Sequence, residues 1–341
     1  MSQRRVTIVE IAKEAGVSAQ TVSRVVNGHT NVAPETRDKI QEIIDRRGYH
    51  PSRLARSLLR GRSHTVGVVG YGLGLFGPSY TLAGIVREAN KEGYSVLPNM
   101  STEPEIDDPT SIIGELIEYH VDGIIWAVPE IGNNHDWIET VLPEHDIPFV
   151  FLSMANRPNL TTVAIDNYTG GQMAAQHLID KGRRHLGLLK GPSDWWEARE
   201  RARGWYDTLH ANGLTVDENL VLQGDDWSAA EGERCMRELL QRKHDIDAVF
   251  IGNDSMAIGA LKTTREFGLK VPDDIAVIGF DDVPEAAYIY PSLTTVQQNL
   301  TSLGCRALAE LDRLIKADDA DWVSSAASIV IQPQLIIRDS A

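Results

Sequence analysis

The segment AGVSAQTVSRVVNG carries side chains that could read DNA bases. Gln20, Arg24 and Asn27 are spaced i, i+4 and i+7, so on a helix they share a polar face, with Ala19 and Ser23 beside them. A Gln side chain offers the donor and acceptor pair that fits an adenine edge, and an Arg offers the fork that fits guanine. The pattern therefore predicts a helix for the major groove of DNA; a solvated helix face is the alternative.

Short helices should position that face. Thr7 and Glu10 form a T-x-x-E capping box, which predicts the start of a first helix, and Gly16 should end it. Ser18 is a good N-cap for the second helix, whose valines make one apolar stripe. Pro34 should open a third helix that covers the first two, since proline favours the first helical position. This arrangement is typical of a helix-turn-helix head.

The charge of the chain is divided between two parts. The net charge is -15, but residues 1–62 hold 12 Lys and Arg against 6 Asp and Glu, which is +6, so the remainder carries -21. Phosphate repels an acidic surface and is neutralised by Lys and Arg. The composition therefore favours a basic head that meets DNA and an acidic body that stays off it.

From residue 65 onward, short β-branched runs alternate with amphipathic helices, which predicts parallel sheets. Residues 65–164 and 165–293 repeat the same rhythm, so we expect two lobes with a ligand between them at the carboxyl ends of the strands. Gly72, Gly74 and Gly77 form a GxGxxG pattern, and a nicotinamide-binding domain is a competing hypothesis. The second strand ends in PNM rather than the acidic residue that holds a ribose, which counts against it.

Residues suited to sugar binding follow several of these strands. Arg199 comes after a strand end and a helix start, where a guanidinium can fork onto two hydroxyls. Asn253 and Asp281 lie at strand ends, where short polar side chains can take hydroxyls in pairs. Trp227 offers a flat apolar face to a sugar ring, with core packing as the alternative, and for Trp205 core packing is the preferred interpretation.

Other classes of protein are not favoured. Cys235 and Cys305 have no partner at CxxC spacing, which argues against disulfides or a thiolate metal site and indicates a cytoplasmic protein. The opening MSQRRVTIVE lacks a signal-peptide pattern, and no apolar run reaches the roughly 20 residues of a membrane span. A transport binding protein would carry a signal peptide instead of a basic head. No GxSxG or HExxH motif and no paired catalytic carboxylates appear, so we expect no enzyme and no metal or cofactor.

Three segments, VTIVEIAKEAGVSAQTVSRVVNG, VAPETRDKI and GYHPSRLARSLLRGRSHTVGVV, resemble the lac repressor (LacI/GalR) family. The resemblance implies a lambda-repressor-like, all-α helix-turn-helix domain at residues 1–50, a hinge helix and linker at 51–63, and an α/β two-lobed periplasmic-binding-protein-like domain at 64–341. Lobe 1 is expected at about 64–164 and 295–322, and lobe 2 at about 165–294 and 323–341.

The resemblance also implies roles for single residues. The base-reading positions are Ala19, Gln20 and Arg24. The positions that contact the DNA backbone are Thr7, Ser18, Thr21, Ser23 and Asn27. Leu58 matches a hinge-helix leucine that wedges into the minor groove, with a plain amphipathic linker as the alternative. The positions that bind the effector are Tyr71, Leu75, Pro78, Asp166, Trp195, Arg199, Trp227, Asn253, Asp281 and Gln298, although Asp166 could serve the hinge between the lobes instead.

The implied function is that of a homodimeric repressor that binds a pseudo-palindromic operator and releases it when a small saccharide binds. No leucine-heptad tail follows QLIIRDSA, so a dimer is expected rather than a tetramer. The GPS segment and the Trp-rich turn resemble members that sense β-linked disaccharides or glucosides. The same architecture sensing a purine or a phosphorylated sugar as corepressor is the alternative.

Overall fold

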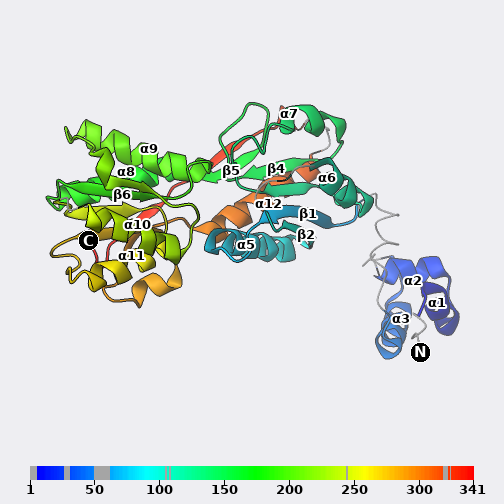
Figure 1. Cartoon of the computed structure of the whole chain (residues 1–341). Coiled ribbons are helices and arrows are strands. Elements are labelled where there is room, and N and C mark those ends of the chain that lie inside the picture. Colours follow the sequence, from blue (N-terminus) through cyan, green and yellow to red (C-terminus); the bar gives the residue numbers. More distant parts are fainter. Residues whose placement is uncertain are drawn as a thin grey trace. The chain divides into compact units, whose positions relative to one another are not determined.

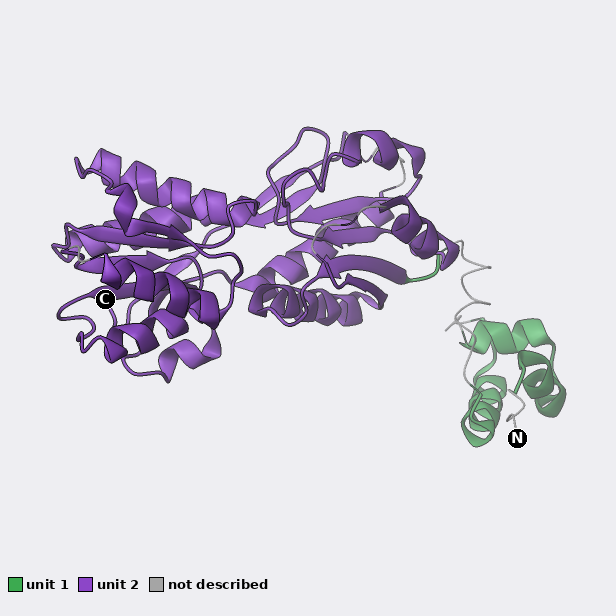
Figure 2. Cartoon of the chain, viewed as in Figure 1, with its two compact units in different colours: residues 1–64 green, residues 65–341 purple. Residues whose placement is uncertain are grey.

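The structure is a computed structural model that describes residues 6–26, 31–49, 62–103, 106, 109–242, 245–317, 322 and 324–341. Its contacts divide the chain into a first unit of residues 1–64 and a second unit of residues 65–341 (Figure 2). Asn27, Leu58 and most of the expected hinge helix lie outside the described residues.

Three helices make up the described part of the first unit: α1 (Ile8–Ala15), α2 (Ala19–Val26) and α3 (Pro34–Arg47). The predicted capping box is confirmed, because the Thr7 side chain accepts a hydrogen bond from the Glu10 amide and the Glu10 carboxylate accepts one of 2.8 Å from the Thr7 amide. Ile11, Val22 and Ile40, one from each helix, are fully buried together. The apolar stripes thus hold the three helices around one small core.

The second unit contains two six-stranded sheets (Figure 1). The first sheet has the order β11 (Ser328–Ile331), β5 (Thr162–Ile165), β4 (Phe149–Leu152), β3 (Ile124–Ala127), β1 (Thr65–Tyr71) and β2 (Ser95–Ser101). The second has the order β12 (Gln334–Ile336), β10 (Thr294–Gln297), β9 (Ala276–Asp281), β8 (Ala248–Ile251), β6 (Leu186–Lys190) and β7 (Val221–Gln223). Neighbouring strands are parallel except β10 and β12. We call the two halves built on these sheets lobe 1 and lobe 2.

Helices cover both faces of each sheet. Those of lobe 1 are α5 (Phe76–Glu92), α6 (Pro109–Glu118), α7 (Ile138–Val141) and α12 (Leu300–Lys316). Those of lobe 2 are α8 (Asn167–Asp180), α9 (Trp196–Ala211), α10 (Ala229–Gln241) and α11 (Asp254–Glu266). The buried β-branched and aromatic strand residues pack between these layers, as expected for parallel sheets covered on both sides. Among the described residues, no helix combines the length and apolar character needed to cross a membrane.

Glycines allow the covering helices to pack in close pairs. A Cβ atom added at Gly204 of α9 would lie 2.0 Å from a carbonyl oxygen of α8, and one at Gly171 of α8 would lie 2.1 Å from the carbonyl oxygen of Arg201. Gly84 of α5 and Gly304 of α12 meet in the same way. These contacts fix the position of α9 against the sheet, and with it the side chains that α9 turns inward.

The chain crosses between the lobes at places that differ from the expected boundaries. β10 belongs to the sheet of lobe 2, although residues from 295 onward were expected in lobe 1, and β11 belongs to lobe 1, although residues from 323 onward were expected in lobe 2. The reason is strand pairing: the fully buried Thr294, Thr295 and Val296 pair with β9, and β11 pairs with β5. The crossings therefore follow β5, β10 and β11.

Candidate functional site

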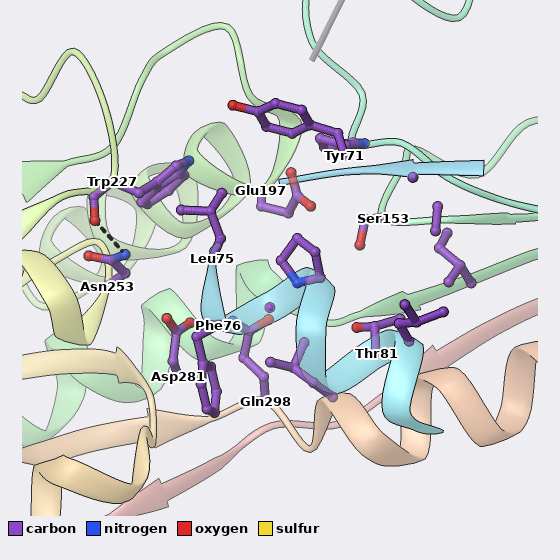
Figure 3. A pocket seen from close by; sticks show the side chains of 18 of the residues that line it. Tyr71, Leu75, Phe76, Thr81, Ser153, Glu197, Trp227, Asn253, Asp281 and Gln298 are labelled. Atoms are coloured by element: carbon purple, nitrogen blue, oxygen red, sulfur yellow. Dashed lines mark hydrogen bonds between the residues drawn. The ribbon is translucent and has the colours of Figure 1, made fainter. Parts of the chain in front are cut away.

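A cavity of about 390 Å³ lies between the lobes at the carboxyl ends of the strands (Figure 3). Its volume falls within the range of roughly 300–1,000 Å³ that is usual for small-molecule sites. Of the ten side chains expected to bind an effector, eight line it: Tyr71, Leu75, Pro78, Trp195, Trp227, Asn253, Asp281 and Gln298. The structure therefore brings together residues that are more than 200 positions apart in the sequence.

Strand ends and helix starts position the polar groups of the cavity. Asn253 caps α11 by accepting a hydrogen bond of 2.8 Å from the Met256 amide, and its own amide donates to the Trp227 carbonyl oxygen at 3.1 Å. Asp281 ends β9 and accepts a hydrogen bond from the side chain of Gln298, which lies at the crossing from β10 to α12. These bonds hold both side chains in place at the cavity wall.

The structure does not bring Arg199 to the cavity. Its side chain is exposed, donates to the Asp194 carbonyl oxygen at 2.6 Å and lines a separate surface hollow. Arg201 lines the cavity instead, because two residues turn a helix by about 200°. The buried residues of α9 at positions 198, 201, 202 and 205 mark its inner face, and this spacing in the sequence could have identified Arg201.

Arg201 is held on every side. It is 6% exposed, its Nε donates to Asn167 Oδ1 at 2.8 Å, and Nη1 donates to the Gly252 carbonyl oxygen at 2.6 Å. The guanidinium carbon lies 3.8 Å from the centroid of the Phe280 ring, and Nη1 lies 4.0 Å from Asp281 Oδ1. The structure thus presents a fixed guanidinium and a carboxylate side by side at the cavity.

Asp166 lies outside the cavity wall, at the first crossing between the lobes. It caps α8 by accepting a hydrogen bond of 2.9 Å from the Thr169 amide, and its Oδ2 accepts one of 3.2 Å from Gln332, which lies at the third crossing. Of the two roles open to Asp166 from the sequence, this geometry favours the hinge between the lobes.

Aromatic rings line one side of the cavity. Trp195 and Trp227 meet at right angles, with 5.7 Å between ring centroids and 81° between planes, and Tyr71 lies 6.3 Å from Trp195. Trp227 fits because Gly191 has no side chain: a Cβ atom there would lie 2.3 Å from the indole ring. Trp205, by contrast, is fully buried in the core of lobe 2.

Several lining residues were missed from the sequence. They are Phe76, Thr81, Ser153, Glu197, Arg201, Ser228 and Ser255, among others. Burial raises the pKa of Glu197 to about 7, against the opposing effects of its own backbone amide, Arg201 and Ser153. Burial also raises the pKa of Asp281, although Arg201 opposes the shift. In the described part of the chain, no cluster of His, Cys, Asp and Glu suited to a metal ion is found.

In the first unit, α2 separates a core face from an exposed face. Val22 and Val25 are buried, whereas Gln20 and Arg24 are exposed. Ala19, Thr21 and Ser23 are half-buried, and Ser18 and Thr7 are exposed at the starts of their helices. Ser18 accepts a hydrogen bond of 3.1 Å from the Thr21 amide, as expected of an N-cap. The predicted base-reading pair thus stands free on one face of the helix.

A helix-turn-helix unit joined to a two-lobed ligand-binding unit defines a class of DNA-binding regulators. Residues 7–52 match the family model of bacterial regulatory proteins of the lacI family, and residues 175–341 match that of the periplasmic binding protein-like domain. The chain belongs to the LacI family, and it is a sequence-specific DNA-binding transcriptional regulator.

Relatives along the whole chain support this assignment. The HTH-type transcriptional regulator CelR of Thermobifida fusca is 33% identical over 99% of both chains, and the lactose operon repressor of Escherichia coli is 31% identical over 93% of this chain and 86% of the repressor. Among solved structures, the lac repressor dimer bound to operator and the anti-inducer ONPF has a TM-score of 0.88, with 28% identity and 99% of both chains covered. A CelR–cellobiose complex has a TM-score of 0.72, with 30% identity over 99% of this chain and 100% of that one.

Proposed function

We propose that this regulator is a repressor whose affinity for its operator is controlled by a small neutral saccharide bound in the cavity. The observation that carries the proposal is the pairing of aromatic faces with fixed polar groups in one cavity. Trp195 and Trp227 offer apolar faces, and Arg201 and Asp281 offer donors and acceptors beside them. Sugars are apolar on one face and polar at the rim, so this combination suits them.

The charges of the cavity favour a neutral ligand over a phosphorylated one. Among the described lining residues, Arg201 is the one Lys or Arg, and it already faces Asp281. Glu197 adds a second carboxyl group. A phosphate would meet two acidic groups and one guanidinium that is already hydrogen-bonded, whereas phosphate sites need free cationic or amide donors.

The aromatic geometry favours a sugar over a purine. A flat base is held best between parallel faces or on one open face, but the Trp195 and Trp227 planes lie 81° apart. The CelR relative was solved as a complex with cellobiose, a saccharide, and this supports a β-linked disaccharide or glucoside for the present chain. A purine or phosphorylated sugar as corepressor remains the second candidate.

The proposal includes DNA contacts and assembly. Ala19, Gln20 and Arg24 would read bases, and Leu58 would wedge into the minor groove. The remaining backbone contacts would come from Thr7, Ser18, Thr21, Ser23 and Asn27. The lac repressor neighbour is a dimer bound to operator, which supports a homodimer on a pseudo-palindromic site. Such a regulator works on chromosomal DNA, in the cytoplasm of a bacterium.

A thermal-unfolding screen of the full chain tests the ligand class. Cellobiose, lactose, glucose, glucose 6-phosphate and hypoxanthine are the probes. A ligand at a hundred times its Kd stabilises the folded state by about 2.7 kcal/mol. We expect a disaccharide to raise Tm and to release a fluorescent duplex from upstream of the protein's own gene. Stabilisation by hypoxanthine or glucose 6-phosphate alone would contradict the saccharide assignment.

A further inference from the structure

Glu197 is a carboxyl group in the cavity wall that the chain does not fully satisfy. It is the second residue of α9, in lobe 2, and its side chain lies beside Ser153, which follows β4 in lobe 1 (Figure 3). Its carboxyl group accepts hydrogen bonds from the Ser153 hydroxyl and from its own backbone amide. Its Oε2 atom is shielded from solvent and has no hydrogen-bond partner among the described residues.

A buried acceptor without a partner is costly, and native proteins keep few of them. The charged groups that act on Glu197 are Arg201, one turn further along α9, and Glu130, which follows β3 in lobe 1. Arg201 lowers the pKa of Glu197, but burial outweighs it and Glu130 adds to the rise. Arg201 is also committed to Asn167, Gly252 and Asp281. The missing partner of Oε2 is therefore not supplied by a cation of the protein.

Backbone contacts hold this corner of the cavity across the two lobes. The Trp196 amide donates to the Glu130 carbonyl oxygen at 3.0 Å, and the Gly132 amide donates to the Asp194 carbonyl oxygen at 3.2 Å. The Glu130 side chain is itself fixed by Arg157 at 3.0 Å. A ligand group that bonds to Glu197 thus meets a rigid acceptor at the seam between the lobes.

We propose that Glu197 determines effector specificity: as a carboxylate it accepts a hydrogen bond from a hydroxyl of the saccharide, so that effector affinity rises with pH. This inference rests on the proposed function, because it assigns the ligand a hydroxyl group at this position. The donors that Glu197 already accepts from, a serine hydroxyl and a backbone amide, are neutral. A sugar hydroxyl continues that set of neutral donors.

Titration calorimetry of the full chain at pH 6, 7 and 8 tests the inference, with cellobiose as the probe, or lactose if cellobiose gives no thermal shift. A carboxyl group of pKa about 7 is mostly protonated at pH 6 and mostly charged at pH 8. If the charged form binds, the contribution of Glu197 weakens binding about tenfold at pH 6 relative to pH 8. The change Glu197→Gln keeps an acceptor oxygen but cannot titrate.

Comparison with the variant isolates Glu197 from Asp281, because Asp281 is present in both proteins. We expect the ratio of the variant's Kd to the wild-type Kd to rise about tenfold from pH 6 to pH 8. Glu200→Gln, on the same helix but outside the cavity, is the matched control and should follow the wild-type profile. Glu197→Asp keeps a titrating carboxyl group and should keep a pH dependence, which provides a second variant if Glu197→Gln folds poorly.

Three results would overturn the inference. Parallel pH profiles for wild-type protein and Glu197→Gln would show that Glu197 does not bind as a carboxylate. Tighter binding of glucosamine than of glucose, lost in Glu197→Gln, would assign the position to an amine. If the wild-type protein binds no saccharide at any pH, the proposed function fails and the inference fails with it.

Discussion

Replacing Arg201 with methionine tests which arginine of α9 belongs to the cavity. The change removes hydrogen bonds to Asn167 and Gly252 and leaves the Asp281 carboxylate, 9% exposed, without its cation. Breaking a buried ion pair from one side costs about 3–5 kcal/mol. Gln298 still donates to Asp281, so we expect the lower end of that range, about 3 kcal/mol at pH 8.

The loss should depend on pH in a defined direction. Burial already raises the pKa of Asp281, and removing Arg201, which opposes that shift, raises it further. A carboxyl group with a raised folded-state pKa destabilises the folded state increasingly as pH rises from its unfolded value, about 3.9, through its folded value. The penalty of Arg201→Met is therefore smaller at pH 6 than at pH 8. Adding Asp281→Asn should recover part of the loss at pH 8.

Urea unfolding followed by tryptophan fluorescence measures this effect, because all seven tryptophans lie beyond residue 125 and report on the second unit. Arg199→Met is the matched control. Arg199 is exposed and bonds to backbone carbonyl oxygens, so its loss should change the free energy of unfolding by no more than about 0.5 kcal/mol. A larger loss for Arg199→Met than for Arg201→Met, or a loss for Arg201→Met that does not change with pH, would refute the reasoning.

Three further predictions concern packing, capping and the aromatic wall. Gly204→Ala places a Cβ atom 2.0 Å from a backbone oxygen of α8 and should cost about 2–3 kcal/mol in urea unfolding, whereas Gly114→Ala, in open space on α6, should add about 0.5–1 kcal/mol; equal effects would contradict the close packing. Thr7→Ala removes the α1 cap and should cost about 1 kcal/mol, seen as roughly fivefold faster amide exchange in α1; unchanged exchange would mean that the cap does not limit opening. Trp227→Leu should weaken disaccharide binding by about 1 kcal/mol, or roughly fivefold by calorimetry, and unchanged affinity would leave the indole with core packing alone.

Local signals in the sequence were reliable where a feature depends on neighbouring residues. The capping box of Thr7 and Glu10, the left-handed Gly16 and the proline that opens α3 all follow from a few adjacent positions, and the structure contains each of them. Alternating strand and helix patterns likewise predicted the parallel sheets. The same holds for Asn253 and Asp281, which lie at strand ends and therefore meet at one edge of a sheet.

Features that depend on helix phase or distant pairing were harder to predict. Distance from a strand end does not tell which of two arginines on α9 turns inward, and the prediction for Arg199 does not fit the geometry for that reason. The boundaries of the lobes depend on β11 pairing with β5, which is more than 160 residues away. The unsatisfied oxygen of Glu197 depends on Ser153, on a different lobe, so no short segment of sequence contains its signal.

The fold gives the cavity a short covalent route to the segment that follows the DNA-binding head. β1 ends at Tyr71 in the cavity wall and begins at Thr65, directly after residue 64. It pairs with β2 on one side and β3 on the other, so it cannot bend alone without breaking hydrogen bonds to both neighbours. We infer that an effector which contacts both lobes acts on the hinge by rotating lobe 1 as a rigid body. In a dimer, that rotation changes the separation of the two β1 starts, and with it the ability of two hinge segments to meet on one operator.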